Sequence, residues 1–526
     1  MTFDCDVCVI GSGPAGSMAA YELTRRGRSV IVLERGGYLA PQSTVLGNAF
    51  QPITEADSLT EVAQGSNGIS EILGTMPTIV GGAGEVYGGA SHRFLPEDFF
   101  LHSKIGTVEQ AELADWPFSY DDLEPFYSEA EWILGVSGLA GGEKYPIHRS
   151  RPYPLPPLQV ESEAVQLFDA AAAKFDFHSF PTPLAILSQS YDGRQPCAAC
   201  GFCTGQVCLY AAKSSPTVTT LRHAVESGRC QIIAQASVHR LTLSGRKAVA
   251  AEYSDYQGNR YHLTARCFVL ACGAIFTPRV LLLSVSDKYP NGLGNSFDMV
   301  GRFFSSHVIS GVHGFFNRPV YLPNTHYVHR SIDDLYFGER SVWKGGLLQL
   351  HLQGGLDHLV VRDRSLGFGT SFVSELKAKT GTSPYVYYCG DTLPQISNRV
   401  LLSKTLDRFG FPRARVEYAY HPLDHISAYH GYTQAVRILR EMGASSTSPF
   451  SLKWKEVWSS GYHYSGSCRA GNEERRSVVD HQCRIHDSDN VFVCDASIFP
   501  TSGGAGPALT LQANALRVAA VVGDSL

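Results

Sequence analysis

The sequence predicts an α/β fold in which a Rossmann-like nucleotide-binding domain is joined to a second, sheet-rich (α+β) domain. Three observations predict it. The N-terminus reads as strand, glycine loop, helix and strand; a buried strand and a helix follow over residues 267–284; and the stretch from about 300 to 455 carries short alternating strand patterns. No internal repeat or low-complexity segment is visible along the chain.

The N-terminal unit has the order of elements that a dinucleotide-binding fold requires. We expect an apolar strand at 7–10, a glycine loop at 11–16, a helix over 18–26 closed by Gly27, and a second strand at 29–33. An acidic residue, Glu34, ends the second strand about 20 residues after the loop, as the fingerprint demands. The alternative is a glycine-rich turn that binds no ligand.

Each glycine of the loop has a role in binding a dinucleotide. Gly11 permits the tight turn, Gly13 lets backbone amides approach a pyrophosphate, and Gly16 lets helix and strand pack closely. Glu34 can bind a ribose diol, and its charge disfavours a 2′-phosphate, so the site suits FAD or NAD. The predicted contacts of this unit are Gly11, Ser12, Gly13, Pro14, Ala15, Gly16, Glu34 and Arg35.

The composition is that of an ordinary globular protein and excludes several functional classes. The 526 residues are 44% hydrophobic and carry a formal net charge of −5 without a basic run, so nucleic acid is not an expected partner. No apolar run approaches the roughly 20 residues of a membrane-spanning helix. The nucleotide pattern starts near Asp4, which leaves no room for a signal peptide, and 13 cysteines is an odd count. We therefore expect a cytoplasmic protein with mostly reduced thiols.

The remaining elements can be placed from local patterns. A second glycine-rich loop over 81–94 allows the backbone to lie flat against a large planar ring. We expect a helix over 128–134, a proline-rich surface connection over 149–157, a buried strand and a helix separated by Gly273, strands at 400–403 and 414–418, a helix over 425–442 closed by Gly443, and a last helix from Gly506 to Val522.

Together these motifs resemble the glucose–methanol–choline (GMC) family of FAD-dependent oxidoreductases over nearly the whole chain. The resemblance rests on the N-terminal fingerprint, the 81–89 loop, the Gly273 strand and the C-terminal runs 462–469, 490–500 and 506–510. The runs 116–127 and 398–410 are similar to sugar-oxidising members such as glucoside 3-dehydrogenases and gluconate dehydrogenases. The run 87–91 is similar to flavin oxidases of aminoglycoside biosynthesis, which oxidise the primary alcohol of paromamine-type sugars.

The resemblance implies two domains and further cofactor contacts. A discontinuous FAD domain would comprise 1–150, 190–300 and 455–526, and a substrate-binding cap would comprise 151–189 and 301–454. Further FAD contacts would be Gly82, Tyr87, Gly88, Val238, Gly273, Asp495, Pro507 and Thr510.

His463 matches the catalytic base of the family in its Tyr-His-x-x-Gly-Ser context. The base takes the hydroxyl proton while a hydride passes to flavin N5, and imidazole titrates in the range that suits this task. The family usually places Asn or His where this chain has Gly506, which departs from the pattern. His307 or Asn514 could reach in instead, substrate and water could complete the site, or His307 could be a structural histidine under the flavin.

The resemblance also bears on how FAD is attached. Some members bind FAD covalently through a histidine in the 81–89 loop, where this chain has Val86. Valine cannot form that bond, so we expect noncovalent FAD. His92 lies six residues later and does not take over the role.

Four clustered cysteines could hold zinc or an iron–sulfur cluster. Cys197, Cys200, Cys203 and Cys208 come near the ferredoxin spacing without matching it. Some sugar dehydrogenases of the family carry a cluster in the corresponding region, whereas relatives with similar cysteines are not known to need one. We expect packed free thiols or a disulfide, with a metal site as the alternative.

The sequence thus predicts oxidation of a sugar or glycoside hydroxyl, with hydride to FAD and the proton to His463. The substrate could be the primary alcohol of an aminoglycoside-type sugar, and the electron acceptor oxygen or an unknown carrier. The alternatives are a glycoside 3-dehydrogenase with a non-oxygen acceptor, a redox-silent FAD lyase and a flavin-binding protein without turnover.

Overall fold

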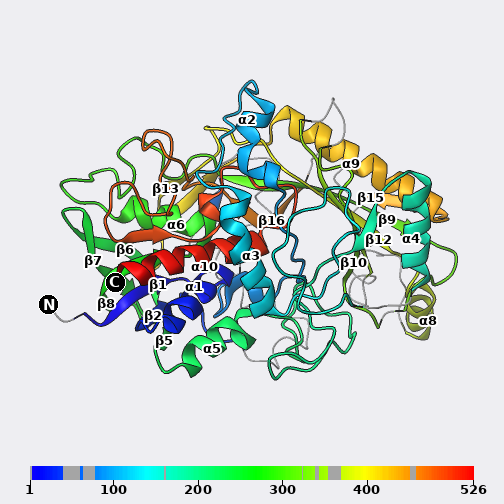
Figure 1. The fold of residues 1–526 in the computed structure, drawn as a ribbon, viewed down its shortest axis with the longest axis horizontal. Coiled ribbons are helices and arrows are strands. Elements are labelled where there is room, and N and C mark those ends of the chain that lie inside the picture. Colours follow the sequence, from blue (N-terminus) through cyan, green and yellow to red (C-terminus); the bar gives the residue numbers. More distant parts are fainter. Residues whose placement is uncertain are drawn as a thin grey trace.

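The protein, described from a computed structural model, has two regions side by side, each built on one large sheet (Figure 1). The structure describes residues 3–39, 60–62, 77–158, 162–322, 324–337, 343–352, 369–449 and 458–526. Both chain ends belong to the same region in Figure 1. This arrangement, a Rossmann-like region plus a sheet-rich region, is the fold class that the sequence predicts.

The first sheet has seven strands: β1 (Cys5–Ile10), β2 (Val30–Leu33), β5 (Cys230–Ile233), β6 (Ser237–Ser244), β7 (Lys247–Ser254), β8 (Arg260–Leu270) and β17 (Val491–Val493). Their order is β5-β2-β1-β8-β7-β6, and β17 also pairs with β8. β1 pairs in parallel with β2 and with β8, whereas β6 and β7 form an antiparallel extension. The strand before Gly273 therefore does return to the nucleotide-binding sheet, as predicted.

Helices pack on this sheet and on one another. They are α1 (Pro14–Arg25), α3 (Tyr120–Leu134), α5 (Thr220–Glu226), α6 (Gly273–Leu283) and α10 (Ala508–Ser525). α1 contacts α5 and α10, and α10 also contacts α3, so the first and last helices of the chain share one core. α1 begins at Pro14, four residues before the predicted start, because the glycine loop leads directly into the first turn.

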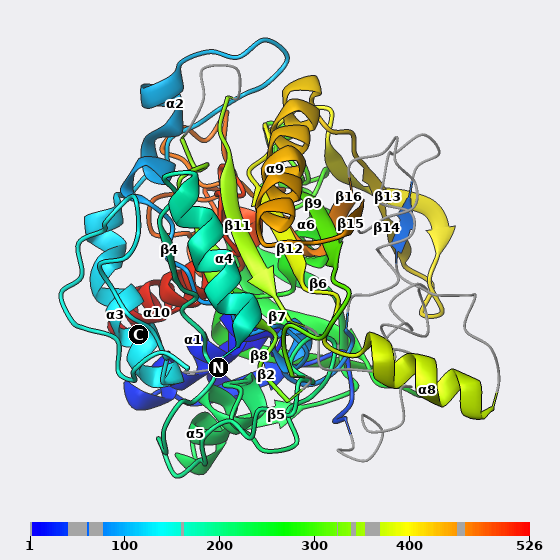
Figure 2. The same cartoon turned by 90° about the vertical axis from the view of Figure 1, so that its right-hand side faces the viewer.

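The second sheet is antiparallel and has seven strands: β4 (Ser179–Pro181), β9 (Ser305–Phe315), β10 (Val328–Ile332), β11 (Gly346–His351), β12 (Tyr385–Gly390), β15 (Ser446–Pro449) and β16 (Trp458–Ser465). Their order is β15-β9-β12-β11-β10-β4, and β16 also pairs with β9. α9 (Pro422–Glu441) packs on β9 and β12, and α4 (Glu163–Lys174) packs on α9 (Figure 2). The strand that carries His463 thus pairs within this sheet, although it lies after the domain boundary predicted at 455.

A small third sheet accounts for two predicted strands. It joins β3 (Thr60–Val62), β13 (Arg399–Leu406) and β14 (Pro412–Glu417). Two further helices are α2 (Leu101–Ile105) and α8 (Thr370–Lys379), and short 3₁₀ turns occur at Gly82–Glu85, Pro96–Phe100, Pro216–Val218 and Ala496–Ile498. Across the part of the chain that the structure describes, the helices are too short or too polar to cross a bilayer.

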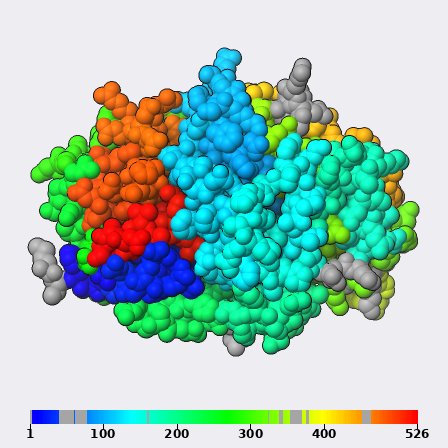
Figure 3. All heavy atoms as spheres, in the orientation of Figure 1, coloured from blue at the N-terminus to red at the C-terminus, as the bar shows by residue number. Residues whose placement is uncertain are grey.

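The helix predicted over 128–134 begins earlier, so that prediction was wrong at its N-terminal end. α3 starts at Tyr120 because Ser119 accepts a hydrogen bond from the Asp122 amide and Asp122 bonds back to Ser119, a capping box. The prediction missed this signal in the run Ser-x-x-Asp. Pro125 is tolerated within the helix, which packs on α10. In Figure 3 the segment around α3, in light blue and cyan, covers the middle of the visible face.

Candidate active site

Glu34 forms a hydrogen-bond network at the start of the nucleotide-binding loop. Its carboxylate accepts hydrogen bonds from the Ser12 hydroxyl at 2.6 Å, the Ser12 amide at 2.9 Å and the Gly36 amide at 2.7 Å. The Ser12 hydroxyl also accepts a hydrogen bond from the Gly81 amide at 2.9 Å. The two glycine loops that the sequence singles out therefore meet at Ser12.

The first loop has the shape that a pyrophosphate needs. A Cβ on Gly16 would lie 1.9 Å from the Gly11 carbonyl oxygen, so only glycine allows this close packing. At Gly13, by contrast, an added Cβ would have nothing within 4 Å. Gly13 is also the N-cap of α1, and no side chain caps that helix. Free amides at a helix N-terminus beside open space fit the phosphates of a dinucleotide such as FAD.

Arg35 and Val238 lie around the same end of the sheet. The Arg35 guanidinium carbon lies 4.2 Å from the centroid of the Phe276 ring, and burial lowers the pKa of Arg35 to about 10. Val238 lies near the start of β6, two residues after Ala236, whose amide donates to the Glu34 carbonyl at 2.8 Å. Arg35 therefore directly follows Glu34 in the chain, and Val238 lies two residues after a residue that bonds to the Glu34 backbone.

Asp495 joins two segments predicted to lie along the cofactor. Its carboxylate accepts hydrogen bonds from the Gly273 amide at 2.8 Å and the Thr277 hydroxyl at 2.6 Å, both in the turn and helix after β8. It also caps its own 3₁₀ turn through the Ser497 amide at 2.8 Å. Burial raises the pKa of Asp495. The structure thus brings Asp495 and Gly273 together, and their contact with FAD stays a prediction.

The last helix holds the other predicted residues of the C-terminus. Pro507 is the N-cap of α10, and the buried Thr510 hydroxyl lies 2.7 Å from the Tyr127 hydroxyl. The Asn514 side-chain oxygen accepts hydrogen bonds from Arg517 of the same helix. Thr510 and Asn514 therefore have partners inside the protein.

A buried lysine that the sequence analysis did not single out holds the second glycine loop. The Lys213 ammonium donates hydrogen bonds to the carbonyl oxygens of Tyr87 at 2.9 Å, Cys203 at 2.6 Å and Gln206 at 2.8 Å. Burial lowers the pKa of Lys213 to about 8. The Tyr87 hydroxyl in turn donates to the Ser214 carbonyl at 3.0 Å. Hydrogen bonds at its backbone carbonyl and at its side-chain hydroxyl thus hold Tyr87 in place.

The four clustered cysteines lie in the loop Cys197–Cys208, which packs against the 81–89 loop. The Gly205 amide donates to the Val86 carbonyl at 2.7 Å, and a Cβ on Gly88 would lie 3.0 Å from the Thr204 hydroxyl. All four are free thiols, and among the described residues no three of their sulfur atoms lie within 4.8 Å of one another. Whether the loop takes up metal stays a prediction.

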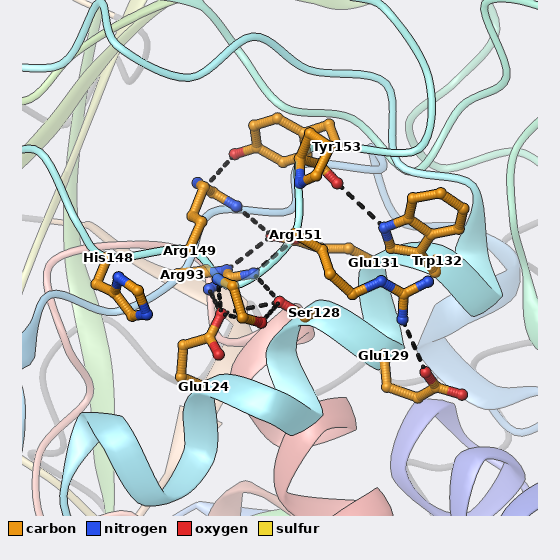
Figure 4. A network of polar contacts seen from close by, with 12 residues as sticks. Arg93, Glu124, Ser128, Glu129, Glu131, Trp132, His148, Arg149, Arg151 and Tyr153 are labelled. Carbon is orange, nitrogen blue, oxygen red and sulfur yellow. Dashed lines mark hydrogen bonds and ion pairs between the residues drawn. The ribbon is translucent and has the colours of Figure 1, made fainter.

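Arg93, just after the second glycine loop, belongs to a buried ion network (Figure 4). Its guanidinium donates two hydrogen bonds to the Glu131 carboxylate, each at 2.8 Å, and one to Glu124 at 3.0 Å. Arg149 also contacts Glu131 at 2.8 Å. Burial acts to raise the pKa of Glu124, but hydrogen bonds from Ser150 and Arg93 lower it to about 2. Because breaking a buried pair costs about 3–5 kcal/mol, the network ties this loop firmly to α3.

His463, the predicted base, is paired with a second histidine. Its Nδ1 lies 2.9 Å from the Nδ1 of His307 on the neighbouring strand β9, and the two ring planes are nearly perpendicular at 87°. The Nε2 of His307 lies 3.0 Å from the Ser502 carbonyl oxygen and 2.8 Å from that of Gly503. One alternative that the sequence leaves open was that His307 reaches into the site. It does so, and its hydrogen-bonding partner there is His463, the predicted base.

These contacts determine which nitrogen of His463 can act as a base. Burial lowers the pKa of His307 to about 4. Burial, and repulsion from His307 when that ring is protonated, lower the pKa of His463 to about 3. Both rings are therefore neutral at pH 7. Both partners of His307 Nε2 are carbonyl oxygens, so this nitrogen carries the proton and Nδ1 accepts. His463 must therefore donate from its own Nδ1. Its Nε2 has no hydrogen-bonding partner among the described residues and keeps its lone pair free.

Gly506 lies next to that free nitrogen. A Cβ on Gly506 would lie 4.0 Å from Nε2 and 3.8 Å from Cε1 of His463, with no other atom closer. Gly506, where the resemblance leads us to expect Asn or His, therefore faces the predicted base, and the missing side chain leaves space beside Nε2. A ligand hydroxyl that occupies this space can donate its proton to His463.

Cys389 is a further neighbour that the sequence analysis missed. Its sulfur lies 4.0 Å from His463 Nδ1, and burial raises the pKa of the thiol. Within the described residues, His307, Cys389 and His463 form the one group of three possible metal ligands whose ligand atoms lie within 4.8 Å of one another. No local pattern joins residues on β9, β12 and β16, so only the folded sheet shows this group.

Comparisons with known proteins match these features. Two sequence profiles described as GMC oxidoreductase match residues 111–309 and 394–515, and one described as FAD dependent oxidoreductase matches residues 6–58. The chain is 31% identical to 6'''-hydroxyparomomycin C oxidase of Streptomyces lividus, over 99% of this chain and 92% of that protein. It is 27% identical to the fructose dehydrogenase large subunit of Gluconobacter japonicus, over 99% of this chain and 98% of that protein. Pyridoxine 4-oxidase from Mesorbium loti superposes with a TM-score of 0.67 at 18% identity, over 98% and 99% of the two chains.

Proposed function

We propose, from the premise that this chain belongs to the GMC oxidoreductase family, that it oxidises a hydroxyl group of a sugar or glycoside. Membership makes it an FAD-dependent oxidoreductase of CH–OH groups, an oxidase or a dehydrogenase. The observation that carries the proposal is the His307–His463 pair, whose free Nε2 faces the space beside Gly506.

The side chains of the site accept and hold one proton. His463 Nε2 takes the proton of the substrate hydroxyl, which makes the carbon a better hydride donor. Bound FAD supplies the hydride acceptor. As His463 becomes charged, its Nδ1–H bond to His307 keeps the ring in place, and the carbonyls of Ser502 and Gly503 keep His307 in the tautomer that accepts this bond.

The finer substrate class is an aminoglycoside-type glycoside whose primary alcohol is oxidised. Two relatives support it: the chain is 31% and 30% identical to proteins named 6'''-hydroxyparomomycin C oxidase and paromamine 6'-oxidase. Similarity to the protein named fructose dehydrogenase large subunit supports the second candidate, a sugar dehydrogenase with an acceptor other than oxygen. We further propose a cytoplasmic location, where free cysteine thiols such as those of this chain stay reduced.

We propose that FAD is held without a covalent bond. Val86 occupies the position at which some members attach the flavin, and its side chain has no nucleophilic atom. Precipitation of the purified yellow protein with acid should therefore leave all FAD in the supernatant, measured by its absorbance. Yellow colour that stays with the precipitated polypeptide would disprove noncovalent binding.

Anaerobic mixing with a substrate panel tests the proposed function. Simple pyranosides, multi-ring glycosides and aminoglycosides with free primary alcohols should bleach the flavin absorbance, and aliphatic alcohols should bleach it more slowly. Readmission of oxygen then separates the two candidates, because an oxidase regains its flavin colour rapidly and a dehydrogenase does not. If no sugar in the panel reduces the flavin, the proposal is wrong, and a lyase or a binding protein becomes the better explanation.

A further inference from the structure

The two faces of the antiparallel sheet differ in chemistry. The face toward α9 is a hydrophobic core that includes Val312, Leu348, Leu350 and Val386 (Figure 2). Side chains alternate between faces along a strand, so the neighbours of these residues point the other way. That opposite face carries histidine, tyrosine and glutamine side chains. They are His307 and His313 on β9, Gln349 and His351 on β11, and Tyr385, Tyr387 and Cys389 on β12.

This polar face is continuous with the catalytic base. Cys389 points to His463, at 4.0 Å from its Nδ1. Tyr387 and Tyr385 follow on the same face of β12, two and four residues away, and His351 of β11 is paired in register with Tyr385. The base and His351 therefore share one surface of one sheet.

His351 is the exceptional residue of this face. It is 5% exposed, and within the described residues neither ring nitrogen has a hydrogen-bonding partner. Buried polar atoms are normally satisfied, and leaving one without a partner is costly. Burial lowers the pKa of His351 to about 3, so the ring is neutral, with one donor and one acceptor. Because Nδ1 and Nε2 point away from each other, two separate groups are needed, and hydroxyls, which both donate and accept, can bond to either nitrogen.

Two half-buried tyrosines flank His351. The Tyr387 ring stacks on the imidazole with centroids 5.1 Å apart at 27°, and the Tyr327 ring meets it edge-on at 4.6 Å and 70°. Tyr327 also approaches the second glycine loop, since its Cδ1 would lie 3.9 Å from a Cβ on Gly88. Tyr327 thus contacts His351 on one side and approaches a loop predicted to contact FAD on the other.

The distance from His463 to the His351 ring and its two flanking tyrosines sets the size of a ligand that contacts both places. His351 packs against both Tyr387 and Tyr385, which lie about 7 and about 14 Å from Cys389 along β12 at a rise of about 3.4 Å per residue. A pyranose ring, with bonds of about 1.5 Å, spans only about 6 Å between opposite exocyclic oxygens, well short of the distance of about 14 Å to Tyr385, the register partner of His351. A single sugar ring with its alcohol at His463 therefore does not extend to His351.

We propose that Tyr327, His351 and Tyr387 form a subsite for a second ring of a glycoside substrate, remote from the alcohol that is oxidised. The inference rests on the proposed function and makes the substrate a glycoside of at least two rings. Hydroxyls of the remote ring hydrogen-bond to the His351 nitrogens, one to each, and the apolar face of that ring packs on Tyr387. The subsite selects for substrate size and leaves the proton transfer to His463.

His351→Phe tests the subsite, because it keeps the aromatic stack and removes both nitrogens. Flavin reduction is followed by anaerobic stopped flow with two substrates that share the reactive ring, a methyl glycoside and the corresponding disaccharide or pseudodisaccharide. The preference for the two-ring substrate, as the ratio of rate over dissociation constant, should fall about tenfold in this variant. His351→Gln, which keeps a donor and an acceptor, should restore part of that preference.

Tyr388→Phe is the matched control, since Tyr388 follows Tyr387 on β12 but faces α9, where its hydroxyl bonds to Ser427 at 2.8 Å. It should keep the wild-type preference. FAD content and melting temperature show whether each variant is folded, and Tyr387→Ala, at a half-buried position, gives a second test if His351→Phe is not. An unchanged preference in folded His351 and Tyr387 variants overturns the subsite. If the wild-type flavin is reduced by neither substrate, the proposed function itself is overturned.

Discussion

Replacement of His463 by alanine should slow flavin reduction by roughly 10²- to 10⁴-fold, the usual contribution of a general base. The expectation follows from the pairing with His307, which uses Nδ1 of His463 and leaves the lone pair on Nε2 available beside Gly506. Anaerobic stopped flow with the best substrate of the panel measures the rate. Because the pKa of His463 is lowered to about 3, the wild-type rate should stay constant from neutral pH down to about pH 5.

A matched histidine substitution separates this effect from a general loss of structure. His262→Ala removes an exposed imidazole from β8 and should reduce its flavin at the wild-type rate. FAD content should be the same in both variants, since no predicted FAD contact is removed. If His463→Ala is reduced as fast as the wild type, another group is the base and the assignment is wrong.

Gly13→Val should yield protein that has lost most of its FAD. In the structure an added Cβ at this position has nothing within 4 Å, so the change is tolerated by the protein itself. The branched side chain instead projects to where the pyrophosphate approaches the N-terminus of α1. FAD released on unfolding, relative to protein, measures occupancy. The apo-protein should also melt at a lower temperature, because a ligand that binds only the native state stabilises it.

Two further substitutions in the same loop show whether the loss of FAD reflects the phosphate site or a loss of folding. Gly13→Ala adds the smaller side chain and should give an intermediate occupancy. Gly16→Val should fail to fold, because its Cβ would lie 1.9 Å from the Gly11 carbonyl oxygen, so its loss of FAD would carry no information about the phosphate site. Full flavin occupancy in folded Gly13→Val would mean that the pyrophosphate binds elsewhere.

The sequence alone determined the elements whose signals are local. The strand, glycine loop, helix and acidic residue of the N-terminus lie within about 35 residues, and the structure has them in that order. The helix closed by Gly443 was likewise predicted within a few residues of α9, because a 3.6-residue period and a C-terminal glycine are both visible in a short window. The start of α3 was missed although its capping box is equally local.

Only the tertiary structure decided how the site is assembled. The base on β16 meets His307 on β9 and Cys389 on β12, and these three residues are far apart in the chain. Strand pairing over such separations depends on register and on the burial of one sheet face, which no local pattern encodes. For the same reason His351 is an ordinary histidine in the sequence. It becomes a candidate substrate contact only when the sheet buries it beside Tyr327 and Tyr387, with no hydrogen-bonding partner in the part of the chain that the structure describes.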